Sequence, residues 1–525
     1  MVANGLTLAA VMMGLPYWLD EVATMVFIGR PFPEMLRYVA TDIHPPLYFV
    51  LLQGWVTLFG WQPWVTAIPS LLFQVLSGLM LYRLADALFG RRAARLAALF
   101  FSSSFFLIFY ATESRMYTLL LAAGLGSTLA TWRIVQRPED RWPWWWLFAW
   151  SVVGVYTQYL YWLLVVAQTL TVFALRRMGR TTVPAREWIV AHLGVLVAFL
   201  PWLPVMVGRL AGKTGQLTWM HTLPLGQKLL TIALDIFVPM NAIANIIGIG
   251  SWRAWAILAL LASLFFFVDT RLTRAELGVR LRRDWPTPVL FCAGIVAVPP
   301  LIGSVVGAWF ARYFMVTIAL LGAAYAKWLS GARLKKTRTA AAVLLLIAAA
   351  AANWRFFFTV FRYEIAFRWS DVATTIRTGS RGTDAVFFAT AEERLQFLYS
   401  YSGPLPVLSF LPRAYRHGDR EVDLLRVAGL PIATVYNVGD ALDDLRPYSS
   451  LWFIHGPSVV LVDPERLIER LIVRHCRPQQ AYVFTGIPGV GVWQEIVATR
   501  YSACTWETPL RRQPTISGLP HPAVP

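Results

Sequence analysis

Long apolar runs fill most of the first two thirds of the chain and constrain it to a lipid environment. A helix needs about 17–25 mostly apolar residues to cross the hydrocarbon core of a bilayer. Runs of this kind cover residues 3–19, 64–88, 93–111, 115–135, 143–157, 158–175, 187–207, 252–269, 287–307, 313–330 and 339–356. The first run lacks a small-residue cleavage pattern, so we interpret it as a spanning helix and not a signal peptide. The sequence predicts a polytopic α-helical membrane protein with about eleven transmembrane helices.

The charge of the chain is distributed as a topology signal. Only 14% of the residues are charged, whereas soluble proteins carry about 25%. The net charge of +18 comes largely from short Arg and Lys clusters between apolar runs, which argues against a nucleic-acid partner. These clusters lie within 83–95, 133–141, 176–186, 271–283 and 333–338. By the positive-inside rule they are cytoplasmic, and the N-terminus is inside.

The intervening loops are then external, and so is the C-terminus. These loops are 20–63, 111–115, 208–251 and 308–312. Residues 226–250 are fairly apolar but contain Asp235, Asn241 and Asn245, so we interpret them as interfacial or re-entrant and leave open whether they span the membrane.

The composition changes after about residue 356, where a soluble domain is expected. Residues 384–390, 404–410 and 450–456 resemble short buried strands, and 391–400 and 464–474 resemble helices. The chain thus divides into a transmembrane module, 1–356, and an external α/β domain, 357–525. The Pro-rich tail after Thr508 is expected to be disordered. Cys476 and Cys504 share the external domain and are expected to form a disulfide there.

Two acids mark the start of the first external loop, 20–63. Asp20 and Glu21 come directly after the first apolar run, at the depth of lipid phosphate groups. Partial desolvation would make such a carboxylate more basic. The alternative is a solvated acidic helix end without a chemical role.

The same loop contains the segment TDIHPPLYF, with Asp42, His44 and Tyr48. Its two prolines prevent a helix from starting before residue 46 and give the preceding side chains a fixed direction. An apolar, aromatic-rich helix that re-enters the interface is expected directly after them. A single histidine is more often a hydrogen-bonded structural residue than a ligand. Because His44 shares a loop with several acids, it is a candidate for contact with a phosphate or a metal ion.

Two more external turns carry ionisable residues close to the hydrocarbon. Glu113, Arg115 and Tyr117 lie in FYATESRMYTLL, and Arg312 and Tyr313 lie in WFARYFMV. Ionisable groups at this depth are costly and usually functional. The alternatives are an ion pair that tethers the first turn and an arginine that reaches to the interface from the second.

These motifs, in this order, resemble one family. WLDE, HPPLY, ESRMYTLL, YTQY and ARYF follow one another as in bacterial GT-C glycosyltransferases, in particular the family 39-related branch with protein O-mannosyltransferases and the aminoarabinose transferases of lipid A. The resemblance covers about residues 15–370. Many relatives have a histidine where this chain has Gln158, so a role of that histidine does not carry over.

The resemblance implies a polyprenyl-phosphate sugar donor and an acidic general base in the first external loop. Here that base is Asp20, with Glu21 as its neighbour. Arg115 and Arg312 would bind the donor phosphate, and Tyr117 and Tyr313 would contact substrate. Asp42, His44 and Glu113 are the candidates for a possible divalent cation, which some relatives use and others do not.

The implied activity is transfer of a hexosyl or pentosyl group, with inversion, to an acceptor hydroxyl at the external face of the bacterial cytoplasmic membrane. The acceptor class stays open between protein, lipid and cell-envelope glycan. The main rival is a transporter or lipid flippase, but transporters tend to carry charges within helices and broken helices in two matching halves. Here the charges lie at external helix ends and no half-to-half repeat is visible, which favours the transferase.

Overall fold

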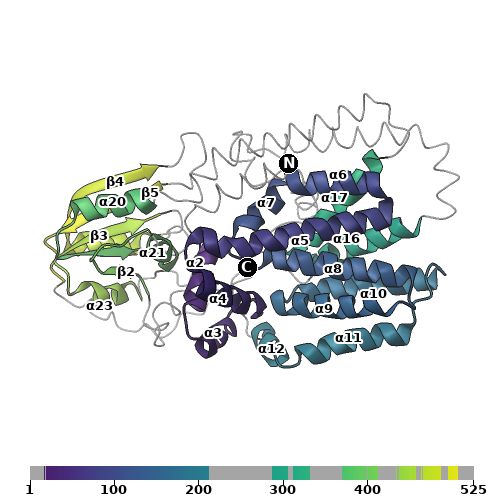
Figure 1. Cartoon of the computed structure of the whole chain (residues 1–525). Helices are drawn as coiled ribbons and strands as arrows, with labels where there is room; N and C mark the ends of the chain where they lie inside the picture. The colour runs from purple at the N-terminus through teal and green to yellow at the C-terminus, as the bar shows by residue number, and fades with distance from the viewer. Residues whose placement is uncertain are drawn as a thin grey trace. The chain divides into compact units, whose positions relative to one another are not determined.

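The computed structural model describes residues 17, 19–211, 286–305, 311–330, 369–398, 400–411, 433, 437–456, 463, 465–485 and 495–506. The chain divides into two compact units, with a boundary between residues 367 and 368 (Figure 1). We describe each unit by itself.

The first unit is helical. Its helices are α2 (Leu19–Ile28), α3 (Phe32–Val39), α4 (Leu47–Phe59), α5 (Pro63–Phe89), α6 (Arg91–Ser103), α7 (Phe105–Thr112), α8 (Tyr117–Gln136), α9 (Arg141–Thr157), α10 (Tyr161–Arg177), α11 (Ala185–Phe199), α12 (Leu203–Ala211), α16 (Thr287–Val305) and α17 (Met315–Leu329), with the short 3-10 helix η2 (Ala311–Phe314) before α17. The predicted helices at 64–88, 115–135, 143–157, 158–175, 287–307 and 313–330 are confirmed within a few residues.

Two predicted helices are each divided in two. The run 93–111 becomes α6 and α7, because Ser104 between them is extended (φ −71°, ψ 113°) and the two segments bend by 58°. The run 187–207 becomes α11 and α12, with Pro201 in the break. Proline has no amide hydrogen, so it interrupts the ladder of helical hydrogen bonds.

Within the described residues, two helices are long and apolar enough to cross a membrane, α5 and α8. The bent pair of α6 and α7 makes three if it counts as one span. The predicted spans 252–269 and 339–356, most of 3–19, the segment 226–250, the basic clusters at 271–283 and 333–338, and the tail after Thr508 lie outside the described residues.

The first external loop is itself largely helical: the helix expected after the two prolines is confirmed as α4, whereas α2 and α3 were not predicted. It contains α2, α3 and α4, and α4 starts at Leu47, directly after the two prolines. The amide of Gln53 in α4 donates to the carbonyl oxygens of Ile28 (2.9 Å) and Arg30 (2.7 Å). These bonds satisfy carbonyl groups at the end of α2 and hold α2 against α4.

Helix α5 contains a proline, and the helical hydrogen bond that this proline removes is replaced by one from a neighbouring side chain. Pro69 cannot donate to the carbonyl of Val65 four residues earlier. The indole Nε1 of Trp55 in α4 donates to that carbonyl instead (2.9 Å). The helix therefore continues, and its hydroxyl-bearing turn at Thr66 and Ser70 is fixed beside α4.

Helix α8 is the centre of the described helices. Nearly all its side chains are buried, and it packs against α5 and α9 (Figure 1). Close approach depends on glycine: a Cβ on Gly126 would lie 2.7 Å from Trp150, and a Cβ on Gly154 would lie 2.2 Å from Tyr161. Small residues at helix contacts are typical of membrane bundles.

The second unit is a mixed α/β domain. Its sheet contains β1 (Asp384–Phe388), β2 (Val407–Ser409), β3 (Ser450–His455), β4 (Arg477–Thr485) and β5 (Glu495–Ser502), in the order β2-β1-β3-β5-β4. Strand β1 is parallel to β2 and β3, whereas β5 is antiparallel to β3 and β4. The helical elements are α20 (Trp369–Gly379), α21 (Ala391–Leu398), η5 (Val438–Asp440), α23 (Ala441–Leu445) and α25 (Leu467–His475).

The predicted strands and helices of this domain are confirmed, although β2 is shorter than expected. Strands β1 and β3 are buried along their whole length, which explains their apolar sequences. Strands β4 and β5 and helix α20 were not predicted. The predicted disulfide between Cys476 and Cys504 is confirmed; it joins the end of α25 to the segment after β5.

Candidate functional site

The turn between α7 and α8 is the framework of the site. The backbone amide of Ser114 donates to Glu21 Oε1 (2.7 Å), and its hydroxyl donates to Thr66 Oγ1 (2.8 Å). The carbonyl of Arg115 accepts from the hydroxyl of Ser70 (3.2 Å). Three side chains from α2 and α5 thus fix a turn that is far from them in sequence.

Asp20 and Glu21 point to different partners. The Glu21 carboxylate is 8% exposed and accepts the Ser114 amide. The Asp20 side chain is 26% exposed and lies among cations: its Oδ2 is 3.4 Å from Arg312 Nη1 and 4.0 Å from Arg115 Nη2. Successive residues of a helix face directions about 100° apart, which separates the two carboxylates.

Arg115 is buried and oriented from one end. Its Nη1 donates to Thr24 Oγ1 (2.8 Å) and to the carbonyl of Asp20 (3.1 Å). Its Nε is buried and has no hydrogen-bond partner among the described residues. A guanidinium group has five donor hydrogens in a rigid fork, so Arg115 keeps donor capacity for a ligand.

Arg312 reaches the same place from η2. Its guanidinium group lies over the ring of Tyr117 (5.4 Å to the centroid) and over that of Tyr313 (5.7 Å). The guanidinium group of Arg115 lies 5.9 Å from the Tyr117 ring centre. Two cations therefore share one aromatic ring, which attracts both through its negative face.

Glu113 is a buried acid beside these cations. Its side chain is 3% exposed, and both carboxyl oxygens lack a hydrogen-bond partner among the described residues. Burial, together with the nearby Glu21 carboxylate, raises the pKa of Glu113 well above the usual range, against the opposing effect of Arg312. The site therefore favours the uncharged form of Glu113 more than water does.

Asp42 and His44 form a pair in the loop before α4. Nδ1 of His44 donates to Asp42 Oδ2 (3.0 Å), while the buried Nε2 has no partner among the described residues. Burial lowers the pKa of His44 below its usual value, although Asp42 opposes the shift. Burial also opposes the charged form of Asp42, but His44 and Arg115 hold the pKa of that carboxyl below its usual value.

This pairing changes the chemistry expected of His44. A neutral imidazole that donates from Nδ1 has a lone pair at Nε2. That atom accepts a hydroxyl proton or binds a metal ion, and it does not donate to a phosphate. The sequence reasoning left these possibilities open.

A three-residue metal site from Asp42, His44 and Glu113 does not form in this part of the chain. Among the described residues, no three His, Cys, Asp or Glu side chains are close enough to hold a metal ion. We therefore derive no chemical step that depends on a metal.

The predicted residues lie in one region of the helical unit, with Asp20, Arg115 and Arg312 in direct contact. Sequence reasoning missed the hydroxyl groups that orient them: Thr24, Thr66, Ser70 and Ser114. Thr24, Thr66 and Ser70 are polar residues in apolar helices, and Ser114 lies in the turn before α8. Such residues are common and uninformative by themselves. Gln158, which replaces a histidine of many relatives, is buried at the end of α9.

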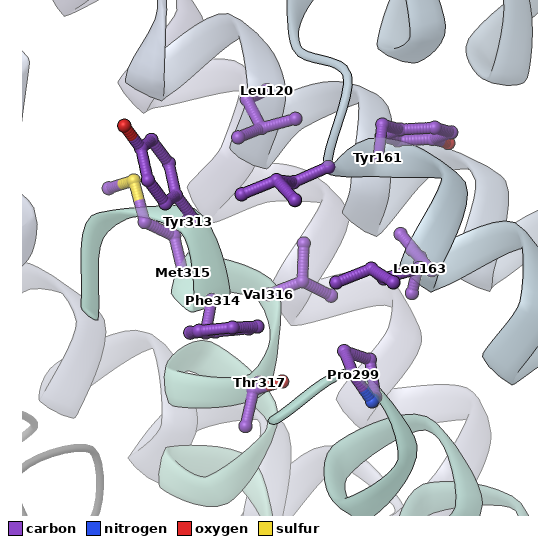
Figure 2. Close-up of a pocket in the computed structure, with 11 residues that line it drawn as sticks. Leu120, Tyr161, Leu163, Pro299, Tyr313, Phe314, Met315, Val316 and Thr317 are labelled. Atoms are coloured by element: carbon purple, nitrogen blue, oxygen red, sulfur yellow. The ribbon is translucent and has the colours of Figure 1, made fainter. Parts of the chain in front are cut away.

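An apolar pocket lies next to the cations. Its volume is ≈ 30 Å³, and it is lined by side chains from α8, the start of α10, α16, η2 and α17 (Figure 2). Leu120, Leu163, Pro299 and Val316 are among its walls. Tyr313 lines it too, and Tyr313 also packs against Arg312, so one residue belongs to both the pocket and the charged site.

Comparison with known proteins agrees with this architecture. The model of the family described as dolichyl-phosphate-mannose-protein mannosyltransferase matches residues 43–207. No curated protein matches the sequence. The chain is similar to the structure of ArnT from Cupriavidus metallidurans bound to undecaprenyl phosphate, with 14% identity, a TM-score of 0.51, and coverage of 95% of this chain and 97% of that one.

The apo structure of the same ArnT gives a similar result, with 13% identity, a TM-score of 0.53, and coverage of 95% and 96%. At these identities the likeness shows the fold. The family model matches about a third of the chain, and the ArnT-like fold covers 95% of it.

Proposed function

We propose that the chain transfers a sugar from a polyprenyl-phosphate carrier to an acceptor hydroxyl, with Asp20 as the general base. The observation that carries this proposal is the Asp20 carboxylate between Arg312 (3.4 Å) and Arg115 (4.0 Å). The carboxylate that we propose as the base thus lies within 4.0 Å of both cations that we propose bind the phosphate. Undecaprenyl phosphate bound to ArnT supports a carrier of this class, because ArnT shares the fold.

Asp20 suits the reactive role better than Glu21. Its side chain is 26% exposed, so a substrate can reach it, whereas Glu21 is buried and binds the Ser114 amide. Removal of Glu21 would disturb the turn that carries Arg115. We therefore assign Asp20 to proton transfer and Glu21 to positioning of the turn.

The reaction follows from these positions. Asp20 takes the proton of the acceptor hydroxyl, and the acceptor oxygen attacks the anomeric carbon of the sugar. The bond between that carbon and the phosphate oxygen breaks, and the electron pair leaves with the polyprenyl phosphate. Arg115 and Arg312 stabilise the negative charge that grows on the phosphate. A single displacement of this kind inverts the anomeric configuration.

The remaining site residues have supporting roles in this scheme. We place the start of the carrier chain against the pocket beside Tyr313, because that pocket is apolar and adjoins Arg312, although its ≈ 30 Å³ does not enclose a whole isoprene unit. Nε2 of His44 is a hydrogen-bond acceptor for a substrate hydroxyl. Tyr117 holds the two arginines near each other through its ring.

We place the reaction at the external face of the bacterial cytoplasmic membrane. The disulfide between Cys476 and Cys504 supports an oxidising compartment for the C-terminal domain, because cytosolic thiols are kept reduced. The basic clusters at 83–95, 133–141 and 176–186 support a cytoplasmic position for the opposite helix ends.

The test is a donor panel. Purified full-length protein is incubated with polyprenyl-phosphate-linked hexoses and pentoses together with a membrane extract as acceptor. Release of polyprenyl phosphate is measured by mass spectrometry. The proposal predicts that one donor is consumed and that its sugar appears covalently on an acceptor. Intact donors throughout, with a panel that covers the common sugars, would contradict it.

A further inference from the structure

The same two arginines are needed twice in the proposed reaction. In the resting site they neutralise Asp20, since Arg312 and Arg115 both contact its Oδ2. In the reaction they would bind the donor phosphate. Asp20 and that phosphate are both anions, so they compete for one pair of cations.

Without substrate, the two arginines require a nearby negative charge. Arg115 is buried, Arg312 is largely buried, and both guanidinium groups lie within 6 Å of the Tyr117 ring centre. Two buried positive charges beside the same ring destabilise a protein unless a negative charge compensates them. Glu113 is a poor compensating charge, because burial raises its pKa and so opposes its charged form. Glu21 is committed to the Ser114 amide.

We propose that Asp20 is the resting counter-ion of the donor-phosphate site, and that donor binding draws Arg115 and Arg312 from Asp20 to the phosphate. This inference rests on the proposed function. Arg115 is suited to such an exchange, because Thr24 and the Asp20 carbonyl anchor its Nη1, while Nε has no partner among the described residues. Nη1 of Arg115 keeps its hydrogen bonds, while the opposite side of the guanidinium group exchanges the Asp20 carboxylate for the phosphate.

The charges balance at both ends of the reaction. Before transfer, the Asp20 carboxylate and the donor phosphodiester each carry one negative charge, against two arginines. After transfer, Asp20 holds the acceptor proton and is neutral, and the released phosphate monoester carries two charges. The proton moves from the acceptor to Asp20, and one negative charge moves from Asp20 to the released phosphate. The site therefore holds two negative charges before and after transfer, which match the two positive charges of the arginines.

The consequence is a binding penalty that Asp20 imposes. When free polyprenyl phosphate is added to wild-type protein, it must bind beside the negatively charged Asp20. Asp20→Asn removes that charge and keeps the shape of the side chain. Two charges about 6 Å apart near a protein surface interact strongly enough to predict a change of roughly tenfold, after allowance for solvent screening.

The experiment measures the affinity of undecaprenyl phosphate for full-length protein in lipid nanodiscs, by titration calorimetry. The variants are Asp20→Asn, Asp20→Glu, Arg115→Ala and Arg312→Gln, and the double variant of Asp20→Asn with Arg312→Gln. Glu34→Gln is the matched control, because Glu34 is an acid of the same loop that binds the hydroxyl of Tyr38. Thermal unfolding of each variant shows that it is folded.

We expect Asp20→Asn to bind about tenfold more tightly than wild type, and Asp20→Glu and Glu34→Gln to bind like wild type. The gain should shrink when Arg312 is also replaced. If Asp20→Asn binds like wild type or more weakly, while the arginine variants lose affinity, the counter-ion inference is wrong and the proposed donor site stands. If the arginine variants bind like wild type, the donor-phosphate site itself is wrong.

Discussion

Arg115 is the residue whose replacement separates binding from chemistry. Its hydrogen bonds to Thr24 and to the Asp20 carbonyl place its charge in the site before any substrate arrives. We expect Arg115→Ala to raise the apparent KM for the donor about tenfold or more, because a charge-assisted contact to a phosphate is lost. Steady-state kinetics at varied donor concentration measure this. Arg37→Ala, an exposed arginine of α3, is the matched control and should leave KM unchanged.

Glu113 leads to a prediction about stability. Because the folded protein holds its pKa well above the usual value, the unfolded chain loses this proton at lower pH than the folded chain. Glu113 therefore lowers the free energy of unfolding increasingly as pH rises above about 4.5, the ordinary pKa of a glutamate. Glutamine resembles the neutral acid and has no such dependence.

We expect Glu113→Gln to raise the Tm at pH 7.5 and to have little effect at pH 4.5. Thermal unfolding of both proteins at a series of pH values measures the difference. A constant difference across this range would mean that Glu113 does not titrate differently in the folded protein.

At this scale the sequence identified the charged residues, and the resemblance implied a role for each, with Asp20 as the base and the arginines at the donor phosphate. Asp20, Arg115 and Arg312 were all candidates, and the structure places them in contact. The sequence did not show that Glu21 binds the Ser114 amide while Asp20 lies beside the arginines, because adjacent residues of one motif can face different partners. The orienting hydroxyls, such as Thr24 and Ser70, were missed because a hydroxyl in an apolar helix does not reveal its long-range partner.

Among the helices, the contact between α8, α9 and α10 depends on glycine. Gly154 lies against the ring of Tyr161, and a Cβ there would be only 2.2 Å from that ring. We expect Gly154→Ala to lower the Tm, because overpacking a buried contact typically costs about 1–3 kcal/mol. Differential scanning fluorimetry in detergent measures it.

Gly54→Ala in α4 is the matched control. Nothing lies within 4 Å of a Cβ at that position, and alanine favours a helix more than glycine does. The Tm of this variant should stay the same or rise. An unchanged Tm in Gly154→Ala would show that α9 and α10 are not held together at this point.

Which elements the sequence revealed depends on length and burial. Long helices such as α5 and buried strands such as β1 and β3 were predicted, because a single apolar run fixes each of them. Helices α2 and α3 of the first loop were missed, since each is short and α3 is strongly amphipathic. Strand β4 was missed because most of its side chains are exposed and RPQQ at its start has no strand periodicity.

For the molecule as a whole, the pattern of basic clusters predicts that the first external loop and the C-terminal domain lie on one side of the membrane. We expect Arg37→Cys in α3 and Thr374→Cys in α20 to react with an impermeant maleimide added to intact cells. Glu139→Cys, between α8 and α9, should react only after the membrane is permeabilised. All three positions are exposed in the structure. Labelling of Glu139→Cys in intact cells would reverse the orientation.

The family resemblance and the fold were also within reach of the sequence. The order of WLDE, HPPLY and ESRMY was enough for the resemblance, and the match over residues 43–207 and the ArnT fold agree with it. The acceptor was not within reach, because specificity resides in loops and side chains that bind the second substrate, and no motif of this chain identifies it.

The most direct test of the account is turnover of the donor by three proteins: wild type, Asp20→Asn and Glu21→Gln. Release of polyprenyl phosphate is measured at saturating donor, with retained folding checked by thermal unfolding. We predict that Asp20→Asn loses about 10²–10⁴-fold in kcat, the usual contribution of general-base assistance. Glu21→Gln should lose far less, because a glutamine oxygen still accepts the Ser114 amide. Near-normal turnover in Asp20→Asn, with a large loss in Glu21→Gln, would contradict the assignment of the base.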